Sequence, residues 1–288
     1  MRNVNNNPIL FIIAVILVAL AAGATPSEAQ TPGQAYRAPR LPGTQAPDLN
    51  GIWQVLDNSI NWDLEGHTAG PAPFPELTGA YGAMPAGVGV VEGGQIPYQS
   101  WALAKKKENF EKRLVRPTTL ELNQTAGDPE AKCYLPGVPR ATYIGLPFQI
   151  IQTPNQILVS YEFDASLRMI HVDRKPEAPL PSWMGWSVAQ WEGDTFVVQV
   201  TDQREETWFD RAGNFHSDAL KVTERYTPIT PYHMMYEATI EDPKVFTRPW
   251  KISMPLYRAM EPNKQILDYR CVEFVETFMY GHLLDGPK

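Results

Sequence analysis

The sequence predicts an all-β fold: an antiparallel up-and-down barrel of about eight to ten strands, with one N-terminal helix and long irregular arms. In the run 157–275, apolar residues recur at every second position, the spacing that buries one face of a strand. Turn signals rich in Gly, Pro, Asn and Asp separate the segments, and no helical run lies between them. The predicted strands in this run are 157–163, 167–172, 196–200, 220–226, 236–240, 250–256 and 266–274.

Consecutive strands joined by short turns bury one face either by closing into a barrel or by folding into a sandwich. The first predicted strand favours the barrel. Gly51 and Trp53 stand two residues apart in the segment 48–54, which is similar to the opening of lipocalin-like barrels, although any first strand can carry a tryptophan. We therefore expect a lipocalin-like barrel in a single domain, 48–288, with its strand meander over about 150–276.

Length and composition are those of a globular protein. The chain has 288 residues, of which 43% are hydrophobic and 20% charged, so it can bury a sizeable core. Its formal net charge is −7, and it has no basic footprint of the kind that nucleic acid or anionic lipid requires. We expect neither as a partner.

The N-terminus predicts export. Arg2 precedes an almost wholly apolar stretch, 9–22, which is followed by small residues at Ser27 and Ala29. This pattern is typical of a secretory signal peptide, here 1–29. An uncleaved anchor is the alternative, but an apolar stretch of about 14 residues is short for a membrane span of roughly 20. We expect a periplasmic or extracellular protein without stable membrane insertion after cleavage.

The chain has two cysteines, Cys133 and Cys271. In an oxidising compartment a disulfide between them is favoured, and two buried free thiols are the alternative. Two isolated cysteines make no zinc site alone, and the CxxC, HExxH and Walker patterns are absent from the sequence. We therefore predict no metal and no cofactor.

Three segments stand outside the strand pattern. Residues 30–47, rich in Pro, Gly, Ala and Gln, predict a disordered linker. Residues 65–95 show little periodicity and predict a long irregular excursion: a lid, a wrapping arm or a mobile loop. A helix is expected over about 97–115, with a solvated face around the lysines 105–107. Its expected apolar stripe consists of Trp101, Leu103, Phe110 and Leu114.

Several short stretches carry a resemblance to known proteins. In chain order they are Cys-Tyr-Leu-Pro-Gly-Val-Pro-Arg at 133–140, Trp-Glu-Gly-Asp-Thr at 191–195, Trp-Phe-Asp at 208–210, His-Ser-Asp-Ala-Leu at 216–220, Thr-Glu-Arg-Tyr at 223–226, Asp-Pro at 242–243 and Thr-Arg-Pro-Trp at 247–250. Together they resemble an uncharacterised family of secreted acidobacterial and proteobacterial proteins. The resemblance covers roughly 128–282 and implies a bacterial origin and export. It carries over no activity and no catalytic residue.

Strand parity singles out one carboxylate. Glu224 falls on the same face as Leu220, Val222 and Tyr226, so it points into the interior of a closed barrel. Burial of a carboxylate raises its pKa toward the range used in acid–base catalysis. Alternatively, Glu224 pairs inside the barrel with an arginine such as Arg168 or Arg248 and ties strands together.

His216 lies in a turn just before the Glu224 strand. A loop histidine near an internal carboxylate can act as a proton shuttle or a metal ligand, although such a residue is more often a surface or capping residue. We take Glu224 and His216 as the catalytic candidates. His171 with Asp173, or Glu273 with Tyr269, are further pairs expected on one strand face.

Aromatic side chains are abundant and offer large contact areas for a flat or amphipathic ligand, although they can equally fill a core. A short stiff loop, 134–139, can also hold Arg140 in place. The expected ligand-binding residues are Trp183, Trp186, Trp191, Tyr226, Tyr236, Trp250, Arg140, Arg248, Tyr269 and Glu273.

Three functions remain open. The first is an exported barrel that binds a small amphipathic or aromatic molecule in its interior. The second is a lyase, dehydratase or isomerase that uses Glu224 in the same cavity. The third is an envelope scaffold with a solid core and no ligand. The sequence does not specify an oligomeric state.

Overall fold

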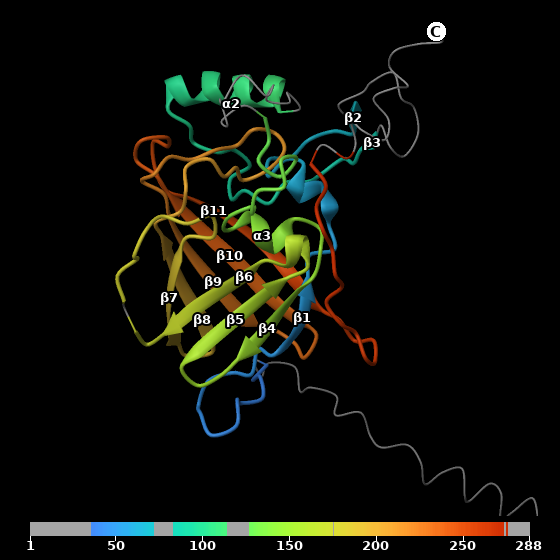
Figure 1. Cartoon of the computed structure of the whole chain (residues 1–288), viewed down its shortest axis with the longest axis vertical. Coiled ribbons are helices and arrows are strands. Elements are labelled where there is room, and N and C mark those ends of the chain that lie inside the picture. The colour runs from blue at the N-terminus through green and yellow to red at the C-terminus, as the bar shows by residue number, and fades with distance from the viewer. Residues whose placement is uncertain (1–35, 72–82, 114–126, 175, 274, 276–288) are drawn as a thin grey trace, which may run out of the picture. The chain divides into compact units, whose positions relative to one another are not determined.

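The computed structural model describes residues 36–71, 83–113, 127–174, 176–273 and 275 (Figure 1), with backbone alone for 70, 71, 83 and 84. These residues belong to one compact unit, Tyr36–Lys288. The predicted signal peptide, 1–29, lies outside the described residues. No helix within the described ranges is long and apolar enough to cross a membrane.

Nine strands form a closed barrel, which confirms the predicted all-β barrel. Around the ring, each strand is hydrogen-bonded to the next in the order β1-β11-β10-β9-β8-β7-β6-β5-β4, and β4 closes on β1 (Figure 1). The strands are β1 (Gly51–Gln54), β4 (Phe148–Gln152), β5 (Gln156–Tyr161), β6 (Leu167–Val172), β7 (Trp186–Glu192), β8 (Thr195–Thr201), β9 (Lys221–Pro228), β10 (His233–Glu241) and β11 (Trp250–Arg258).

Every neighbouring pair in the ring is antiparallel except β6 and β7, which are parallel. A closed ring can be antiparallel throughout only if the number of strands is even, because strand direction must alternate around it. With nine strands, one parallel junction is required. The pairing there is short and joins Ile170 to Ser187 and Val172 to Ala189.

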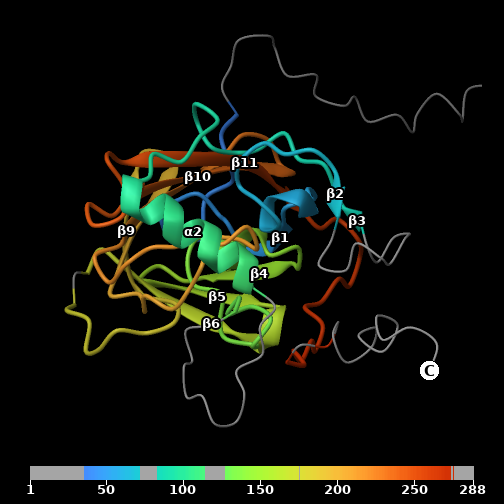
Figure 2. The same cartoon turned by 90° about the horizontal axis from the view of Figure 1, so that it is seen from above.

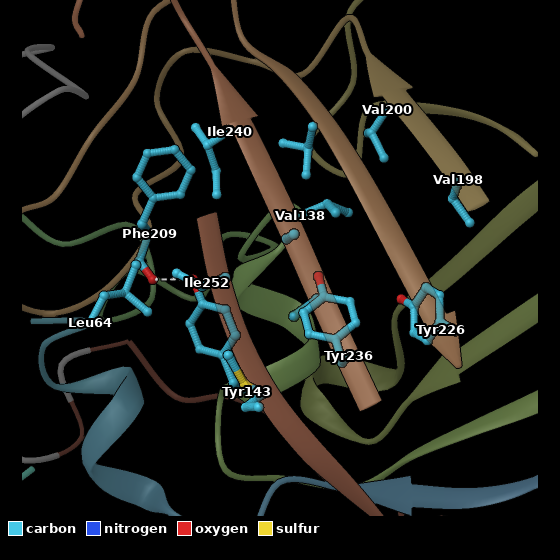
Figure 3. Close-up of a cluster of buried hydrophobic side chains, with 14 of the residues drawn as sticks. Leu64, Val138, Tyr143, Val198, Val200, Phe209, Tyr226, Tyr236, Ile240 and Ile252 are labelled. Carbon is cyan, nitrogen blue, oxygen red and sulfur yellow. Dashed lines mark hydrogen bonds between the residues drawn. The ribbon is translucent and has the colours of Figure 1, made fainter. Parts of the chain in front are cut away.

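Alternation along each strand places one set of side chains inside the barrel. On β10, Met234, Tyr236, Ala238 and Ile240 are fully buried, while the residues between them are partly exposed. The register sets Tyr236 directly opposite Tyr226 of β9. Figure 3 shows the resulting interior, in which side chains of β8 to β11 project toward one another. The period of two found in the sequence therefore corresponds to the interior face.

The end of the barrel where β4 finishes is covered by residues 36–50, which we call the strap. The side chain of Gln152 accepts a hydrogen bond from the Leu49 amide (2.7 Å) and donates one to the Pro47 carbonyl (3.0 Å). Leu49 is only 1% exposed. The prediction of a disordered linker over 30–47 is therefore wrong for 36–47, because these side-chain bonds order a segment that has little periodicity of its own.

The opposite end, where β4 begins, is filled by short helices and loops. They include η1 (Asn58–Asn61) and α3 (Arg140–Tyr143). A further short helix, η3 (Phe163–Ala165), connects β5 to β6. The Tyr143 hydroxyl donates to the Phe209 carbonyl at 2.9 Å, which ties α3 to a loop over the barrel (Figure 3). The strap and these segments thus lie at opposite ends of the barrel (Figure 1).

The predicted helix is α2 (Ser100–Lys112), which crosses the loops at this end of the barrel (Figure 2). The expected apolar stripe is not its buried face: Trp101 and Leu103 are each 53% exposed, and Phe110 is 42% exposed. Leu114 lies outside the described residues. The buried residues of the helix are the small or polar Ala102 and Asn109.

The large apolar side chains of α2 do not form its buried face because the backbone of the helix lies close to the backbone at Gly213. A Cβ atom on Gly213 would lie 2.8 Å from both the Lys106 carbonyl oxygen and the Phe110 amide nitrogen. Large apolar side chains have no room in such an interface, so they point elsewhere. The Asn109 side chain donates to the Gly213 carbonyl at 3.3 Å and completes the contact.

The excursion 65–95 is ordered where the structure describes it. Strands β2 (Gly70–Pro71) and β3 (Ala83–Met84) pair with each other. Residues 90–92 run beside β11. The Glu92 amide donates to the Lys251 carbonyl (2.8 Å), and the Ser253 amide donates to the Val90 carbonyl (3.1 Å). Of the alternatives for this segment, the wrapping arm fits, because it extends the barrel wall beside β11.

The C-terminal segment differs from expectation. Residues 266–273 form no strand, so the predicted strand 266–274 is wrong across the part of it that the structure describes, and Glu273 shares no strand face with Tyr269. The predicted disulfide is confirmed: Cys133 and Cys271 are bonded, with their Cα atoms 5.5 Å apart. This segment is therefore attached by a covalent bond and not by sheet pairing.

Candidate functional site

A buried ion pair lies inside the barrel. Arg168 of β6 and Glu224 of β9 are 2% and 0% exposed. The guanidinium donates to both carboxylate oxygens, through Nη1 to Oε1 at 3.3 Å and through Nη2 to Oε2. Of the two arginines considered as partners, Arg168 is the one found. Arg248 lies in an exposed loop and donates to the Pro249 carbonyl.

Two tyrosines and a serine complete this group. The hydroxyls of Tyr226 and Tyr236 each donate to Glu224 Oε1 at 2.9 Å, and Arg168 Nε donates to the Ser187 hydroxyl at 2.8 Å. We call these five residues the interior polar cluster. Figure 3 shows Tyr226 and Tyr236 side by side on β9 and β10.

The pKa values of the arginine and of the two tyrosines in this cluster are all raised. Burial alone would lower the pKa of Arg168, but the Glu224 carboxylate outweighs it and raises that pKa well above its usual value. Burial and the same carboxylate raise the pKa values of Tyr226 and Tyr236. Arg168 is therefore charged and the two phenols are neutral over the physiological pH range.

Little space remains beside this cluster. A free space of about 10 Å³ lies toward the strap, roughly the size that holds one water molecule. Pockets for small ligands are typically about 300–1,000 Å³. The lining is apolar or aromatic and consists of Leu49, Phe148, Ile150, Ile157, Val159, Ile170, Phe196 and Tyr226.

His216 belongs to a different group of residues. Its Nδ1 lies 2.8 Å from the Ser217 carbonyl and its Nε2 lies 2.7 Å from the Thr207 hydroxyl. Because a carbonyl only accepts, Nδ1 carries the proton, and burial lowers the pKa of the ring. His216 is thus a neutral, hydrogen-bonded histidine, and no hydrogen bond or ion pair within the described ranges joins it to Glu224.

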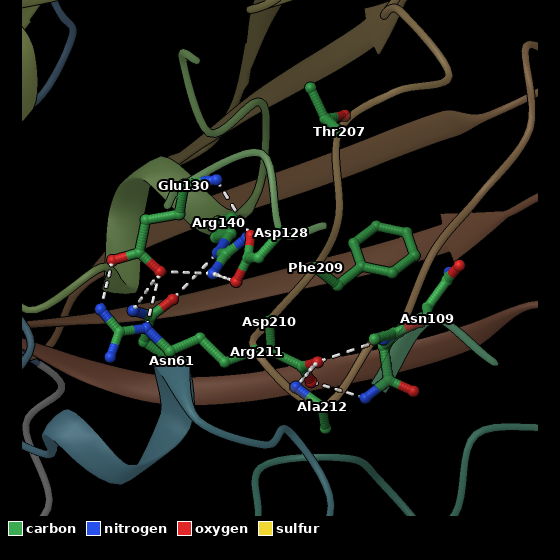
Figure 4. A network of polar contacts seen from close by, with 12 residues as sticks. Asn61, Asn109, Asp128, Glu130, Arg140, Thr207, Phe209, Asp210, Arg211 and Ala212 are labelled. Atoms are coloured by element: carbon green, nitrogen blue, oxygen red, sulfur yellow. Dashed lines mark hydrogen bonds and ion pairs between the residues drawn. The ribbon is translucent and has the colours of Figure 1, made fainter. Parts of the chain in front are cut away.

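A second cluster of charges closes the α3 end. Arg140, fully buried, donates to both Asp128 oxygens (2.8 and 3.0 Å), to Glu130 (2.5 Å) and to Asn61 (2.9 Å). Arg211 binds Glu130 through two bonds of 2.9 Å (Figure 4). We call these five residues the end cluster. The expectation that Arg140 is held in a fixed position fits this geometry, but its donors are used by the protein itself.

The end cluster is strongly ionised. Burial raises the pKa of Glu130, but the Arg211 and Arg140 guanidiniums outweigh burial and lower that pKa to about 2. The pKa of Arg140 is raised because Asp128 and Glu130 more than offset its burial. The disulfide lies beside this cluster, since Cys271 Sγ approaches the Glu130 carbonyl at 3.9 Å.

One buried titratable group could not be identified from the sequence. Asp210 is fully buried, and its pKa is raised to about 7 by burial and by the neighbouring carboxylate of Asp63. The Asn214 amide bridges the two carboxylates, at 2.6 Å from Asp210 and 3.4 Å from Asp63. The sequence offered only a lone Asp after two aromatic residues, which does not reveal a partner 147 positions away, the separation from 63 to 210.

The three neighbouring tryptophans do not line one cavity. Trp183 packs on Tyr134, with ring centroids 4.7 Å apart, and lies under the Arg204 guanidinium. Trp186 is on the outer face of β7, beside His171 at 4.8 Å. Trp191 packs on Phe196 at 4.8 Å.

The remaining predicted ligand residues are also dispersed. Trp250 is buried between Phe209 and Phe246, at centroid distances of 5.5 and 5.4 Å. Tyr269 is 37% exposed and lies 5.8 Å from Phe163, and Glu273 is exposed. Asp173 follows the end of β6 in an exposed turn. Of the catalytic and ligand-binding residues predicted from the sequence, Glu224, Tyr226 and Tyr236 are joined by hydrogen bonds in the structure.

Comparisons with protein-family models, with curated proteins and with solved structures found no match. Within the described ranges, no group of three or more His, Cys, Asp or Glu side chains could hold a metal ion.

Proposed function

We propose that this protein is an exported scaffold, a rigid barrel whose interior is a structural core and whose outer surface makes its contacts. The observation that carries the proposal is the small free space beside the interior polar cluster. About 10 Å³ is free there, next to a fully paired charge cluster. Because pockets for small ligands are typically about 300–1,000 Å³, a ligand has no room at this position.

Export is supported by the disulfide and the predicted signal peptide. Cys133 and Cys271 are joined over a sequence separation of 138. Structural disulfides persist in oxidising compartments such as the periplasm and the extracellular space. A periplasmic or extracellular location suits a scaffold whose stability comes from covalent and buried ionic links.

The contacts of Glu224 favour a structural role over acid–base catalysis. Its Oε1 accepts from Arg168, Tyr226 and Tyr236, and its Oε2 accepts from Arg168. A proton acceptor in catalysis must be within reach of substrate. Here the donors that surround the carboxylate occupy the positions that a substrate would need.

A second candidate, the carrier of a small apolar molecule, is favoured by one feature. The free space is lined by apolar and aromatic side chains, and one of them, Leu49, comes from the strap and not from a barrel strand. Displacement of the strap would enlarge the space without breaking the barrel wall.

Mass spectrometry of the protein secreted with its own signal distinguishes the two candidates. The scaffold proposal expects equal masses under native and denaturing conditions once solvent and salt are subtracted. A native mass higher by one retained small apolar molecule would overturn the scaffold proposal in favour of the carrier.

A cavity variant provides the second test. Leu49→Ala is expected to create an apolar space and to gain a benzene-dependent rise in melting temperature. Leu41→Ala, a control in the same strap that does not line the space, is expected to gain none. The parent should show no benzene effect, and an equal effect in the parent would support the carrier.

A further inference from the structure

The outer face of β7, β8 and β9 carries a groove of about 540 Å³, within the size range of small-ligand sites. Apart from Ala189, which is on the buried face of β7, the strand side chains that form it project outward from the barrel, away from the interior polar cluster. Its lining is Asp173, Arg174, Val188, Ala189, Gln190, Glu192, Val197, Gln199, Thr223 and Arg225.

Strand register explains the composition of the groove. Two outward rows cross the sheet: Val188, Gln199 and Thr223 are directly opposite one another, and so are Gln190, Val197 and Arg225. Each row therefore combines one valine with two polar side chains. The valines form an apolar floor and the polar groups stand over it.

A second hollow of about 350 Å³ continues the groove along β7. The two hollows share Val188, and the second is lined by Trp186 and Thr201, which are opposite each other in the register. The Trp186 indole is held in place by a bond from Nε1 to the Pro176 carbonyl (2.7 Å). Outward positions of β7 thus run from an aromatic ring to a carboxylate, over roughly 20 Å of strand.

The charges that line the larger hollow balance, and the smaller hollow adds two carboxylates, Glu177 and Asp202. In the larger hollow, Glu192 and Arg225 form an ion pair at 2.8 Å, and Asp173 and Arg174 supply one further charge of each sign. Between these charges, the side chain of Gln199 and the hydroxyl of Thr223 make no hydrogen bond within the part of the chain that the structure describes. Amide and hydroxyl groups both donate and accept, so they suit a ligand rich in hydroxyls.

We infer that this groove binds an uncharged oligosaccharide. The balanced charges of the larger hollow leave no sign unpaired for a charged ligand, and the carboxylates of the smaller hollow disfavour an anionic one. Trp186 and the valine floor offer apolar surface to the C–H faces of sugar rings, and Gln190, Gln199 and Thr223 offer partners to their hydroxyls. The inference rests on the proposed function, because it names the ligand class of the outer surface of the scaffold.

Isothermal titration calorimetry tests it, with maltotetraose, cellotetraose and tetra-N-acetylchitotetraose as neutral probes and tetragalacturonate as the anionic comparator. At least one neutral tetrasaccharide is expected to bind saturably. Gln199→Ala should weaken that binding about tenfold, through the loss of its hydrogen bonds, and Trp186→Ala by at least as much.

The matched control is Gln149→Ala, which removes an outward-facing glutamine from β4, outside the groove. It should leave affinity unchanged within about twofold. The inference is overturned if no neutral tetrasaccharide binds, if only tetragalacturonate binds, or if Gln149→Ala weakens binding as much as Gln199→Ala. None of these results alters the mass comparison, so failure of the groove and failure of the scaffold proposal are distinguishable.

Discussion

At the scale of single residues, the burial of charge inside the barrel carries a free-energy cost. Arg168 and Glu224 have been removed from water almost completely, and only their contact and the hydrogen bonds around them compensate. Removing one member of such a pair leaves the other charge buried and unpaired. Exposed pairs behave differently, because water and salt screen them.

Glu224→Gln is therefore expected to lower the free energy of unfolding by roughly 3–5 kcal/mol. The control is Glu192→Gln, which removes the same charge from the exposed pair with Arg225 and should leave stability nearly unchanged. Urea unfolding measures both. Equal effects of the two substitutions would mean that the interior pair carries no special energetic weight.

Asp210 adds a pH dependence at the same scale. Its pKa is about 7 in the folded protein, against an ordinary value of 3.8. Between these values the folded state holds a proton that the unfolded state does not, so this group makes the protein more stable as the pH falls from about 7 to 4. Above pH 7 the full cost of the buried charge remains.

The variant Asp210→Asn should lack this rise in stability between pH 7 and 4. Asp63→Asn should keep the rise but shift it to lower pH, because the like charge that raises the pKa of Asp210 is gone. Free energies of unfolding measured at half-unit steps from pH 4 to 8 test both variants. A parent protein whose stability is flat over this range would contradict the assignment.

At the scale of elements, α2 shows how a backbone contact can override an apolar pattern. The sequence offers Trp101, Leu103 and Phe110 as a stripe, yet the helix packs through Ala102 and Asn109 onto Gly213. Only a residue without a side chain permits that approach, and Gly213 also has φ = +82°, a left-handed conformation that favours glycine.

Two features favour glycine at position 213, the close approach of α2 and the left-handed backbone. A comparison of Gly213→Ala with Gly43→Ala separates their effects on stability. Gly43 has nearly the same φ, +78°, but a Cβ there would meet nothing within 4 Å. Gly43→Ala should therefore cost only about 1–2 kcal/mol for the left-handed backbone. Gly213→Ala should cost roughly 1–3 kcal/mol more, because the new methyl group pushes α2 away. Similar thermal unfolding of the two variants would show that the helix contact contributes little.

At the scale of the whole molecule, sheet pairing and one disulfide bond join parts of the chain that are far apart in the sequence. The disulfide between Cys133 and Cys271 spans 138 positions. It attaches the non-strand C-terminal segment beside the end cluster, where Glu130 binds two arginines. In the chain-entropy account, such a long loop stabilises the fold by restricting the unfolded state.

Replacing both cysteines by serine is expected to lower the free energy of unfolding by roughly 3–5 kcal/mol. Chemical denaturation with and without dithiothreitol gives the same comparison in the parent protein, with the double variant as the control that reductant should not affect. If reductant leaves the unfolding of the parent unchanged, the link is not stabilising.

How much of this could be predicted depends on the range of the interaction. The alternation in β9, β10 and β11 is local, so the inward face, including Glu224, could be read from the sequence. The cysteine pairing could also be inferred, because only two cysteines are present. By contrast, nothing local selects Arg168 over Arg248, since β6 and β9 are not neighbours in the ring and meet only across its interior.

The sequence by itself determined the fold class, the inward face of the longer strands and the disulfide, because period-two burial and covalent pairing are encoded by residue type and spacing. Tertiary structure alone decided that Arg168 pairs with Glu224 inside the barrel, that Arg140 and Asp210 are buried, and that Trp186 faces outward beside a groove. These features depend on barrel closure and on which loops cover each end, and such long-range packing leaves no periodic trace in the chain.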